Sequence, residues 1–329
     1  MVKVRACAFL LACGMLAGVA SAEDKPPANS MEIVNNHDRA LIKDLTAYLQ
    51  AHPKADDLDQ AYMTLLNKAI EHDWFVENEA VAQQYLRDFP EGPIQSLARI
   101  VTTMARAKAG QYNEALTRFE QLMQAVGKSE QEEFAVNFAE SLAVSASGAG
   151  EYHVARKIYQ ILLDRFGESA ALRQKVKDEL ARLDMVGKPA PSVVAHDVDG
   201  KPLNFADYRG KYVLIDFWAT WCAPCIVELP RVQEAFKKFH GQGLEVVGVS
   251  LDETKPAVLD FVKARGIPWR QVHGATAGGD LVEAFGVSSI PATFLISPDG
   301  NIVRIELRGA NLEPSLAKIL KDTPATATR

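Results

Sequence analysis

A pair of cysteines at the start of a helical pattern constrains the fold of this chain most. The apolar run Val213–Trp218 leads to the sequence WCAPC at 221–225, after which the helical pattern begins. Two cysteines three residues apart at a strand-to-helix junction form a dithiol that can close into a small disulfide ring. Cys7 and Cys13, the other two cysteines, lie in a segment that we expect to be removed. The mature protein would then have two thiols, and they are neighbours.

Residues 1–22 have the features of a secretory signal peptide. Lys3 and Arg5 form a basic start, 6–19 is apolar, and Ala20-Ser21-Ala22 forms a small-residue cleavage site. This pattern predicts export to the periplasm with removal of the signal.

Two ways of holding the protein at a membrane are less favoured. The apolar run is shorter than the roughly 20 residues that a membrane span needs. A lipid attached at Cys13 would leave a very short apolar region before it, and Leu11 fits such a site poorly.

The charge balance and the histidines argue against two other classes of ligand. The net charge is −6 at pH 7, which argues against nucleic acid as a partner. The histidines show no metal-ligand spacing near the thiols, and zinc bound by Cys222 and Cys225 would need two further ligands. We therefore expect no metal and no other cofactor.

Residues 30–185 predict an all-α domain. Apolar residues recur there at intervals of three and four, and the sparse glycines and prolines mark breaks between helices. We expect helices near 38–50, 59–72, 76–88, 94–109, 113–126, 130–147, 151–165 and 169–184.

One motif in this domain repeats after forty residues. Gly-x-Tyr-x-x-Ala-x-x-x-Phe at 110–119 returns as Gly-x-Tyr-x-x-Ala-x-x-x-Tyr at 150–159. It resembles the second half of a tetratricopeptide (TPR) unit, although the usual spacing is about 34 residues. Stacked helical hairpins make concave surfaces suited to protein partners. The alternative is that this region is only a spacer or a dimerisation module.

Residues 187–323 predict a second domain, of the α/β class. We expect strands near 192–197, 211–217, 244–250, 269–272, 292–297 and 301–307, and helices near 223–239, 255–265, 278–285 and 313–321. This alternation implies a mixed sheet with helices on both faces.

The position of each cysteine predicts its role in disulfide exchange. A thiol at a helix N-terminus has a lowered pKa because the helix dipole favours the thiolate, which is the nucleophile. Cys222 lies there, and Trp221 shields one side of it while leaving the sulfur reachable. Cys225 lies one turn further and should be less exposed. We expect Cys222 to attack a partner disulfide and Cys225 to resolve the mixed disulfide.

Residues 187–323 resemble the thioredoxin superfamily, specifically its secreted TlpA/ResA-like branch. The resemblance rests on 217–225 (FWATWCAPC), 228–230 (ELP) and 290–296 (IPATFLI), with the lead-in GKPAP at 187–191. It implies a thioredoxin-like fold with a redox-active Cys222–Cys225 disulfide.

The same resemblance assigns a substrate-binding role to two further residues. Pro291 would be a cis-proline facing the dithiol. Ile290 would then expose its backbone for pairing with an extended substrate, beside Trp221. The alternative is an ordinary trans-proline in a loop.

Two carboxylates complete the predicted site. By the resemblance, Asp216 would be the base that helps to deprotonate Cys225, and Glu228 would tune the thiol pKa values. The lysine that accompanies this aspartate in thioredoxins is replaced by Gly248, which favours the protonated form of Asp216. The alternatives are a structural carboxylate for Asp216 and a solvated helix charge for Glu228.

The dipeptide Ala223-Pro224 resembles the Gly-Pro of reductants more than the dipeptides of oxidases and isomerases. We expect a thiol–disulfide reductase of exported proteins, with apocytochrome c among the candidate substrates. Such an enzyme needs a membrane thiol electron donor to stay reduced outside the cytoplasm.

Three alternatives differ in chemistry or in partner. One is an adaptor, of the cytochrome c maturation type, whose helical domain recruits a single client. A second is a disulfide oxidase or isomerase. A third is a peroxidase, but the peroxiredoxin pattern needs Pro and Thr or Ser where Ile215 and Ala219 stand before Cys222.

Overall fold

The computed structural model describes residues 29–125, 132–274 and 279–321. The signal peptide predicted over 1–22, with Cys7 and Cys13, lies outside the described residues. No helix among the residues described has the length and apolar character that crossing a membrane requires.

The N-terminal part is all-helical, as predicted. Its described residues form α1 (Ser30–Ala51), α2 (Leu58–Glu71), α3 (Phe75–Asp88), α4 (Gln95–Lys108), α5 (Tyr112–Ala125), α6 (Glu132–Ala149), α7 (Tyr152–Phe166) and α8 (Ala170–Leu183). The first helix begins eight residues earlier than expected. The Asn29 side chain caps it by accepting a hydrogen bond from the Glu32 amide.

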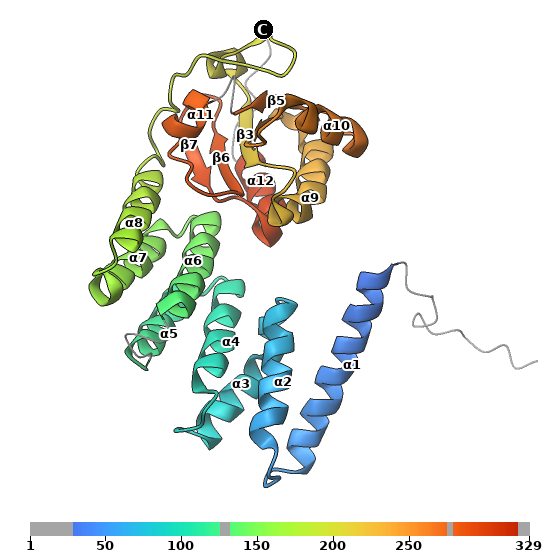
Figure 1. The fold of residues 1–329 in the computed structure, drawn as a ribbon, viewed down its shortest axis with the longest axis vertical. Coiled ribbons are helices and arrows are strands. Elements are labelled where there is room, and N and C mark those ends of the chain that lie inside the picture. Colours follow the sequence, from blue (N-terminus) through green and yellow to red (C-terminus); the bar gives the residue numbers. More distant parts are fainter. Residues whose placement is uncertain (1–28, 126–131, 275–278, 322–329) are drawn as a thin grey trace, which may run out of the picture.

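The repeated motif marks how neighbouring helices pack. Ala115 and Ala155 have no exposed surface, so these small residues let neighbouring helices approach. Phe119 and Tyr159 lie buried between helices. Figure 1 shows the helices following one another in a row that leads up to the sheet. The tetratricopeptide interpretation and the domain limits 30–185 and 187–323 stay predictions.

The C-terminal part contains the predicted mixed sheet. Its strands are β3 (Tyr212–Trp218), β4 (Leu244–Ser250), β5 (Arg270–His273), β6 (Ala292–Ile296) and β7 (Ile302–Ile305), in the order β5-β4-β3-β6-β7. β3, β4 and β5 run parallel, whereas β6 is antiparallel to β3 and to β7. A small hairpin of β1 (Ala195–His196) and β2 (Pro202–Leu203) precedes them.

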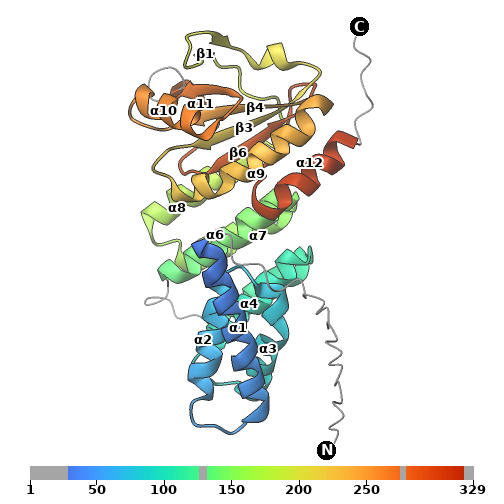
Figure 2. The ribbon, with the colours of Figure 1, turned by 90° about the vertical axis from the view of Figure 1, so that its right-hand side faces the viewer.

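Helices cover both faces of the sheet (Figure 2), as predicted. On one face α9 (Ala223–Phe239) and α12 (Leu312–Lys321) pack on a core that includes Leu214 and Leu295. On the other face α11 (Gly279–Ala284) lies next to a core of Phe217, Phe285 and Phe294. A further helix, α10 (Lys255–Arg265), packs near Trp218 at the end of β3. Short 3-10 turns lie at 205–208, 240–242 and 309–311.

The helical region is docked on the β7 edge of the sheet. The end of α6 approaches the strand so closely that a Cβ on Gly148 would lie 2.5 Å from the Glu306 carbonyl oxygen. Arg182 of α8 is 4% exposed and forms ion pairs with Glu179 and Glu306. The linker adds backbone hydrogen bonds, because Gly187 donates to the Ile302 carbonyl. A sheet edge that would otherwise be open is therefore covered.

Candidate functional site

Cys222 and Cys225 form a disulfide where β3 passes into α9. Their Cα atoms are 5.3 Å apart. Cys222 is the N-cap of α9, and its sulfur accepts a hydrogen bond from the Cys225 amide at 3.3 Å. A free helix N–H and the helix dipole both favour a thiolate at Cys222 after reduction.

The two cysteines are buried to a similar extent in this oxidised form. Cys222 is 5% exposed and Cys225 is 6% exposed, so the predicted lower exposure of Cys225 is not seen here. The N-cap position distinguishes Cys222 instead. Trp221 is 65% exposed directly beside it, and thus offers an apolar surface at the edge of the disulfide.

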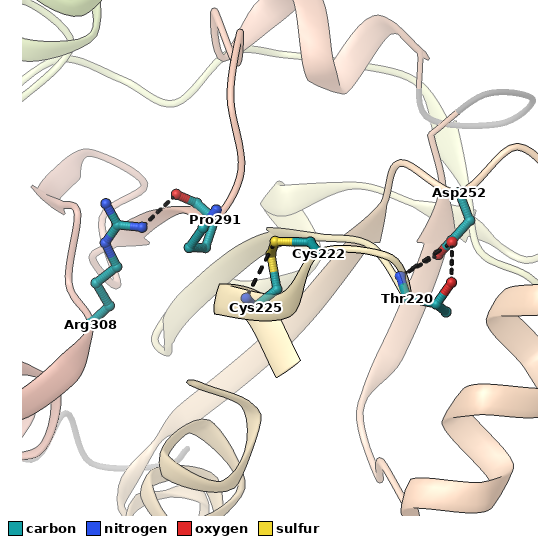
Figure 3. The surroundings of a disulfide bond; sticks show 6 residues. All are labelled: Thr220, Cys222, Cys225, Asp252, Pro291 and Arg308. Atoms are coloured by element: carbon teal, nitrogen blue, oxygen red, sulfur yellow. Dashed lines mark hydrogen bonds between the residues drawn. A yellow bond between two sulfur atoms is a disulfide. The ribbon is translucent and has the colours of Figure 1, made fainter. Parts of the chain in front are cut away.

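The Ile290–Pro291 peptide bond is cis. Figure 3 shows Pro291 beside the disulfide, on the side opposite Thr220 and Asp252. Ile290 packs against the small cluster that contains both cysteines. The loop thus places the Ile290 backbone near the sulfur atoms, although they lie about 65 residues apart in the chain.

Asp216 lies in β3 and shares the α9 side of the sheet with Leu214. Burial, as the main cause, and the negative charge of Glu228 raise the pKa of Asp216 to about 7, while the charge of Arg308 acts in the opposite direction. The paired residue in β4 is Gly248. A Cβ there would lie 2.2 Å from Oε1 of Gln271, so the Gln271 side chain occupies the space in which a larger residue would begin.

Glu228 connects α9 to the turn that follows β7. Its side chain is 13% exposed, and Oε1 accepts a hydrogen bond from the Gly309 amide at 2.6 Å. Its other oxygen lies 3.2 Å from Nη1 of Arg231. Glu228 is therefore a partly buried link between two elements rather than a solvated helix charge.

Two site residues were not predicted from the sequence. Arg308 donates a hydrogen bond from Nη1 to the Pro291 carbonyl at 2.9 Å (Figure 3). Its Nη2 lies 3.1 Å from Glu306. Asp252 is 2% exposed and accepts hydrogen bonds from the amide and the hydroxyl of Thr220. The two residues hold the loops on either side of the disulfide.

One cluster outside this site has the composition of a metal site. Side chains of Asp38, Glu71 and His72 bring possible ligand atoms together. Lys68 already supplies a cation there, because its Nζ lies 3.0 Å from Asp38 and 2.8 Å from Glu71. Hydrogen bonds with His72, and to a smaller extent with Lys68, lower the pKa of Asp38. The cluster is an ion-pair network that joins α1 to α2.

Comparison with known proteins agrees with the geometry of the cysteine pair. The AhpC/TSA family profile matches residues 186–305. The chain is 35% identical over 136 residues to the thiol-disulfide oxidoreductase ResA of Bacillus thuringiensis, and the match covers 41% of this chain and 77% of that protein. The chain belongs to the ResA family of thiol-disulfide oxidoreductases. ResA of Bacillus subtilis is 39% identical over 119 residues, which cover 36% of this chain and 65% of that protein.

Two solved structures of similar proteins each match about two fifths of this chain. The thioredoxin domain of a thiol-disulfide oxidoreductase from Bacteroides vulgatus is 30% identical, with a TM-score of 0.39, and the match covers 41% of this chain and 97% of that one. A thiol:disulfide interchange protein from Chlorobium tepidum is 31% identical, with a TM-score of 0.37 and coverages of 40% and 95%. The family profile matches residues 186–305, so the helical region lies outside that profile.

Proposed function

We propose that this thiol-disulfide oxidoreductase is a reductase of disulfides in exported proteins. The observation that carries the proposal is the N-cap position of Cys222, whose sulfur faces a helix N–H beside the cis Ile290–Pro291 bond. In the first step the Cys222 thiolate attacks one sulfur of a substrate disulfide, forms a mixed disulfide and releases one substrate thiolate. The Cys225 thiolate then attacks the Cys222 sulfur, releases the second substrate thiolate and leaves the Cys222–Cys225 disulfide.

Asp216 suits the proton transfer that the second step needs. With a pKa of about 7, its carboxyl is divided between both protonation states near neutral pH. A general base is most effective when its pKa lies near the working pH. We propose that Asp216 accepts the proton of the Cys225 thiol, and that Glu228 tunes this transfer through its charge.

The substrate would lie against the cis-proline loop. Ile290 offers its backbone to an extended segment, and exposed Trp221 offers an apolar contact on the other side of the disulfide. The proposed substrates are exported proteins with accessible disulfides, including apocytochrome c.

The direction of electron flow is tested by the equilibrium of the Cys222–Cys225 pair with oxidised and reduced glutathione. The Ala223-Pro224 dipeptide supports a reductant, with a potential on the order of −200 to −300 mV. A potential near the roughly −120 mV of a strong oxidant would contradict the reductase and favour the oxidase or isomerase alternative. A reductase outside the cytoplasm also requires a membrane thiol donor, which we propose as its partner.

The proposed site of action is the periplasm, after removal of residues 1–22. N-terminal sequencing of the protein from the periplasmic fraction should give Glu23 as the first residue. An intact N-terminus in the membrane fraction would instead support anchoring.

A dedicated adaptor remains the second candidate because the chain carries a docked helical region. Trapping with Cys225→Ser distinguishes the two, since a general reductase captures several disulfide proteins and an adaptor captures one. The peroxidase is not favoured, because Ile215 and Ala219 are fully buried apolar residues where that chemistry needs Pro and a hydroxyl.

A further inference from the structure

A groove of about 630 Å³ runs between the helical region and the redox site. Pro224, Ile290 and Pro291 line it on the redox side, and Tyr112 and Ser141 are among the residues that line it on the helical side. Sites that enclose ligands typically have volumes of about 300–1,000 Å³. The groove therefore has room for more than the two sulfur atoms of a substrate.

The two walls of the groove are fixed relative to each other. Arg182 is buried between Glu179 of its own helix and Glu306, which follows β7. Glu306 also pairs with Arg308, whose guanidinium donates to the Pro291 carbonyl. Polar contacts thus run without a break from α8 to the cis-proline loop, so the helical wall is held in place beside that loop.

The charged groups in the groove largely neutralise one another. Lys108 pairs with Asp73 and Lys175 pairs with Glu140, while Arg182 and Arg308 pair with Glu179 and Glu306. Among the residues that the structure describes, four basic and four acidic ones line the groove. Its other polar side chains are neutral, namely Tyr112, Asn137, Ser141, Ser145, Tyr159, Ser289 and Asn311.

We propose that this groove holds the uncharged, extended stretch of a client protein that adjoins its reacting cysteine. The proposal rests on the proposed function and makes the helical region one wall of the substrate site. Pro224, Ile290 and Pro291 line the groove next to the disulfide, so a chain joined to Cys222 through a mixed disulfide can extend from the cis-proline loop into the groove. A charged client residue would lose water without meeting an unpaired opposite charge, so neutral flanks are favoured.

Two helical positions allow a matched pair of substitutions that tests whether the helical side of the groove contacts the client. Ser141 and Thr117 are both exposed helical residues whose hydroxyl donates to the carbonyl four residues earlier, Asn137 and Asn113 respectively. Ser141 lines the groove and Thr117 does not. Ser141→Arg therefore places a bulky charge in the groove, and Thr117→Arg places the same charge outside it.

The measurement is the single-turnover rate of the pre-reduced full-length protein with two thionitrobenzoate mixed disulfides. In the cysteine probe, thionitrobenzoate is joined to free cysteine. In the peptide probe, it is joined to the central cysteine of an extended peptide whose flanking residues are polar and uncharged. We expect Ser141→Arg to slow the peptide probe by about tenfold through weaker binding and to leave the cysteine probe unchanged. Thr117→Arg should change neither rate. Unchanged thermal unfolding would show that both variants are folded.

Two further measurements test whether charge in the groove causes the slower reaction of the peptide probe. Ser141→Glu should slow the peptide probe as Ser141→Arg does, because the groove has no free charge of either sign. A peptide with aspartate flanks should react more slowly than the neutral peptide with the unchanged protein. Equal peptide rates for Ser141→Arg and Thr117→Arg, or equal rates for the two peptides, would overturn the inference. Failure of the unchanged protein with both neutral probes would instead contradict the proposed function, and this inference with it.

Discussion

The negative charge of Glu228 on α9 helps to raise the pKa of Asp216 on β3, in addition to the larger effect of burial. Glu228 is held in place by the Gly309 amide, so its position is set by the turn after β7. The pKa of about 7 leaves Asp216 able to exchange a proton at neutral pH. In the proposed mechanism, this relationship links β3, α9 and the turn after β7 to proton transfer at Cys225.

Asp216→Asn should stabilise the oxidised protein at alkaline pH. The folded-state pKa of about 7 lies above the ordinary aspartate value of 3.8, so folding binds a proton at pH values between the two. The stability contributed by the protonated carboxyl is present at low pH and is lost as pH rises through about 7. Denaturant unfolding should show that the wild type loses roughly 3 kcal/mol between pH 5 and pH 8, since each pH unit below the pKa of about 7 corresponds to about 1.4 kcal/mol, and the variant should lack this loss. Asp207→Asn, at an exposed position, is the control, and equal effects of the two substitutions would contradict the account.

Glu228→Gln should move the pH dependence of mixed-disulfide resolution to lower pH. Removing the negative charge lowers the pKa of Asp216, because that charge is one of the two causes that raise it. The rate of the second step would be followed by stopped-flow release of the second thiol across pH 5 to 9. Glu234→Gln changes an exposed residue of the same helix and should leave the profile in place. A midpoint that stays unchanged in Glu228→Gln would disprove the coupling.

Arg308→Gln should shift the same profile in the opposite direction. The Arg308 charge lowers the pKa of Asp216, so its removal raises that pKa. Arg308→Lys keeps the charge and should retain the wild-type midpoint. Both variants should bind peptide disulfides more weakly, because the two-pronged contacts of the guanidinium to Pro291 and Glu306 are lost. A wild-type midpoint in Arg308→Gln is the result that contradicts this assignment.

Gly148→Ala should weaken the docking of the helical region. The added Cβ would lie 2.5 Å from the Glu306 carbonyl oxygen, so the backbone must shift. We expect a loss of about 1–3 kcal/mol in the free energy of unfolding, the usual range for overpacking. Gly241→Ala adds a methyl group to open space and should have little effect. Comparable losses in the two variants would show that the close approach is unimportant.

The sequence predicted most elements because their patterns are regular. Both α9 and α10 have the predicted bounds, since a strand precedes each and clear breaks follow. The two-residue strand β2 was missed because it is too short to show alternation. The first turns of α1 were missed because Met31, Ile33 and Val34 are exposed and form no buried stripe.

The candidate site was predictable only where its residues are close in sequence or belong to a recognised motif. The two cysteines and Pro291 lie together, and Glu228 lies close enough to Asp216 to raise its pKa. The action of Asp216 on Cys225 stays a prediction. Arg308 and Asp252 were missed because their partners lie 17 and 32 residues away and no spacing rule connects them. The Arg182–Glu306 pair joins residues even further apart, so only the folded chain shows that the helical region adjoins the site.

The most direct test of the central claim compares Cys225→Ser with Cys222→Ser. Each reduced variant would be mixed with the neutral peptide disulfide, and intact mass would report the protein–peptide adduct. Cys225→Ser should accumulate a stable mixed disulfide because Cys222 attacks and nothing resolves the product. Cys222→Ser should accumulate little. Equal adduct in both variants, or more in Cys222→Ser, would contradict the assignment of Cys222 as the nucleophile.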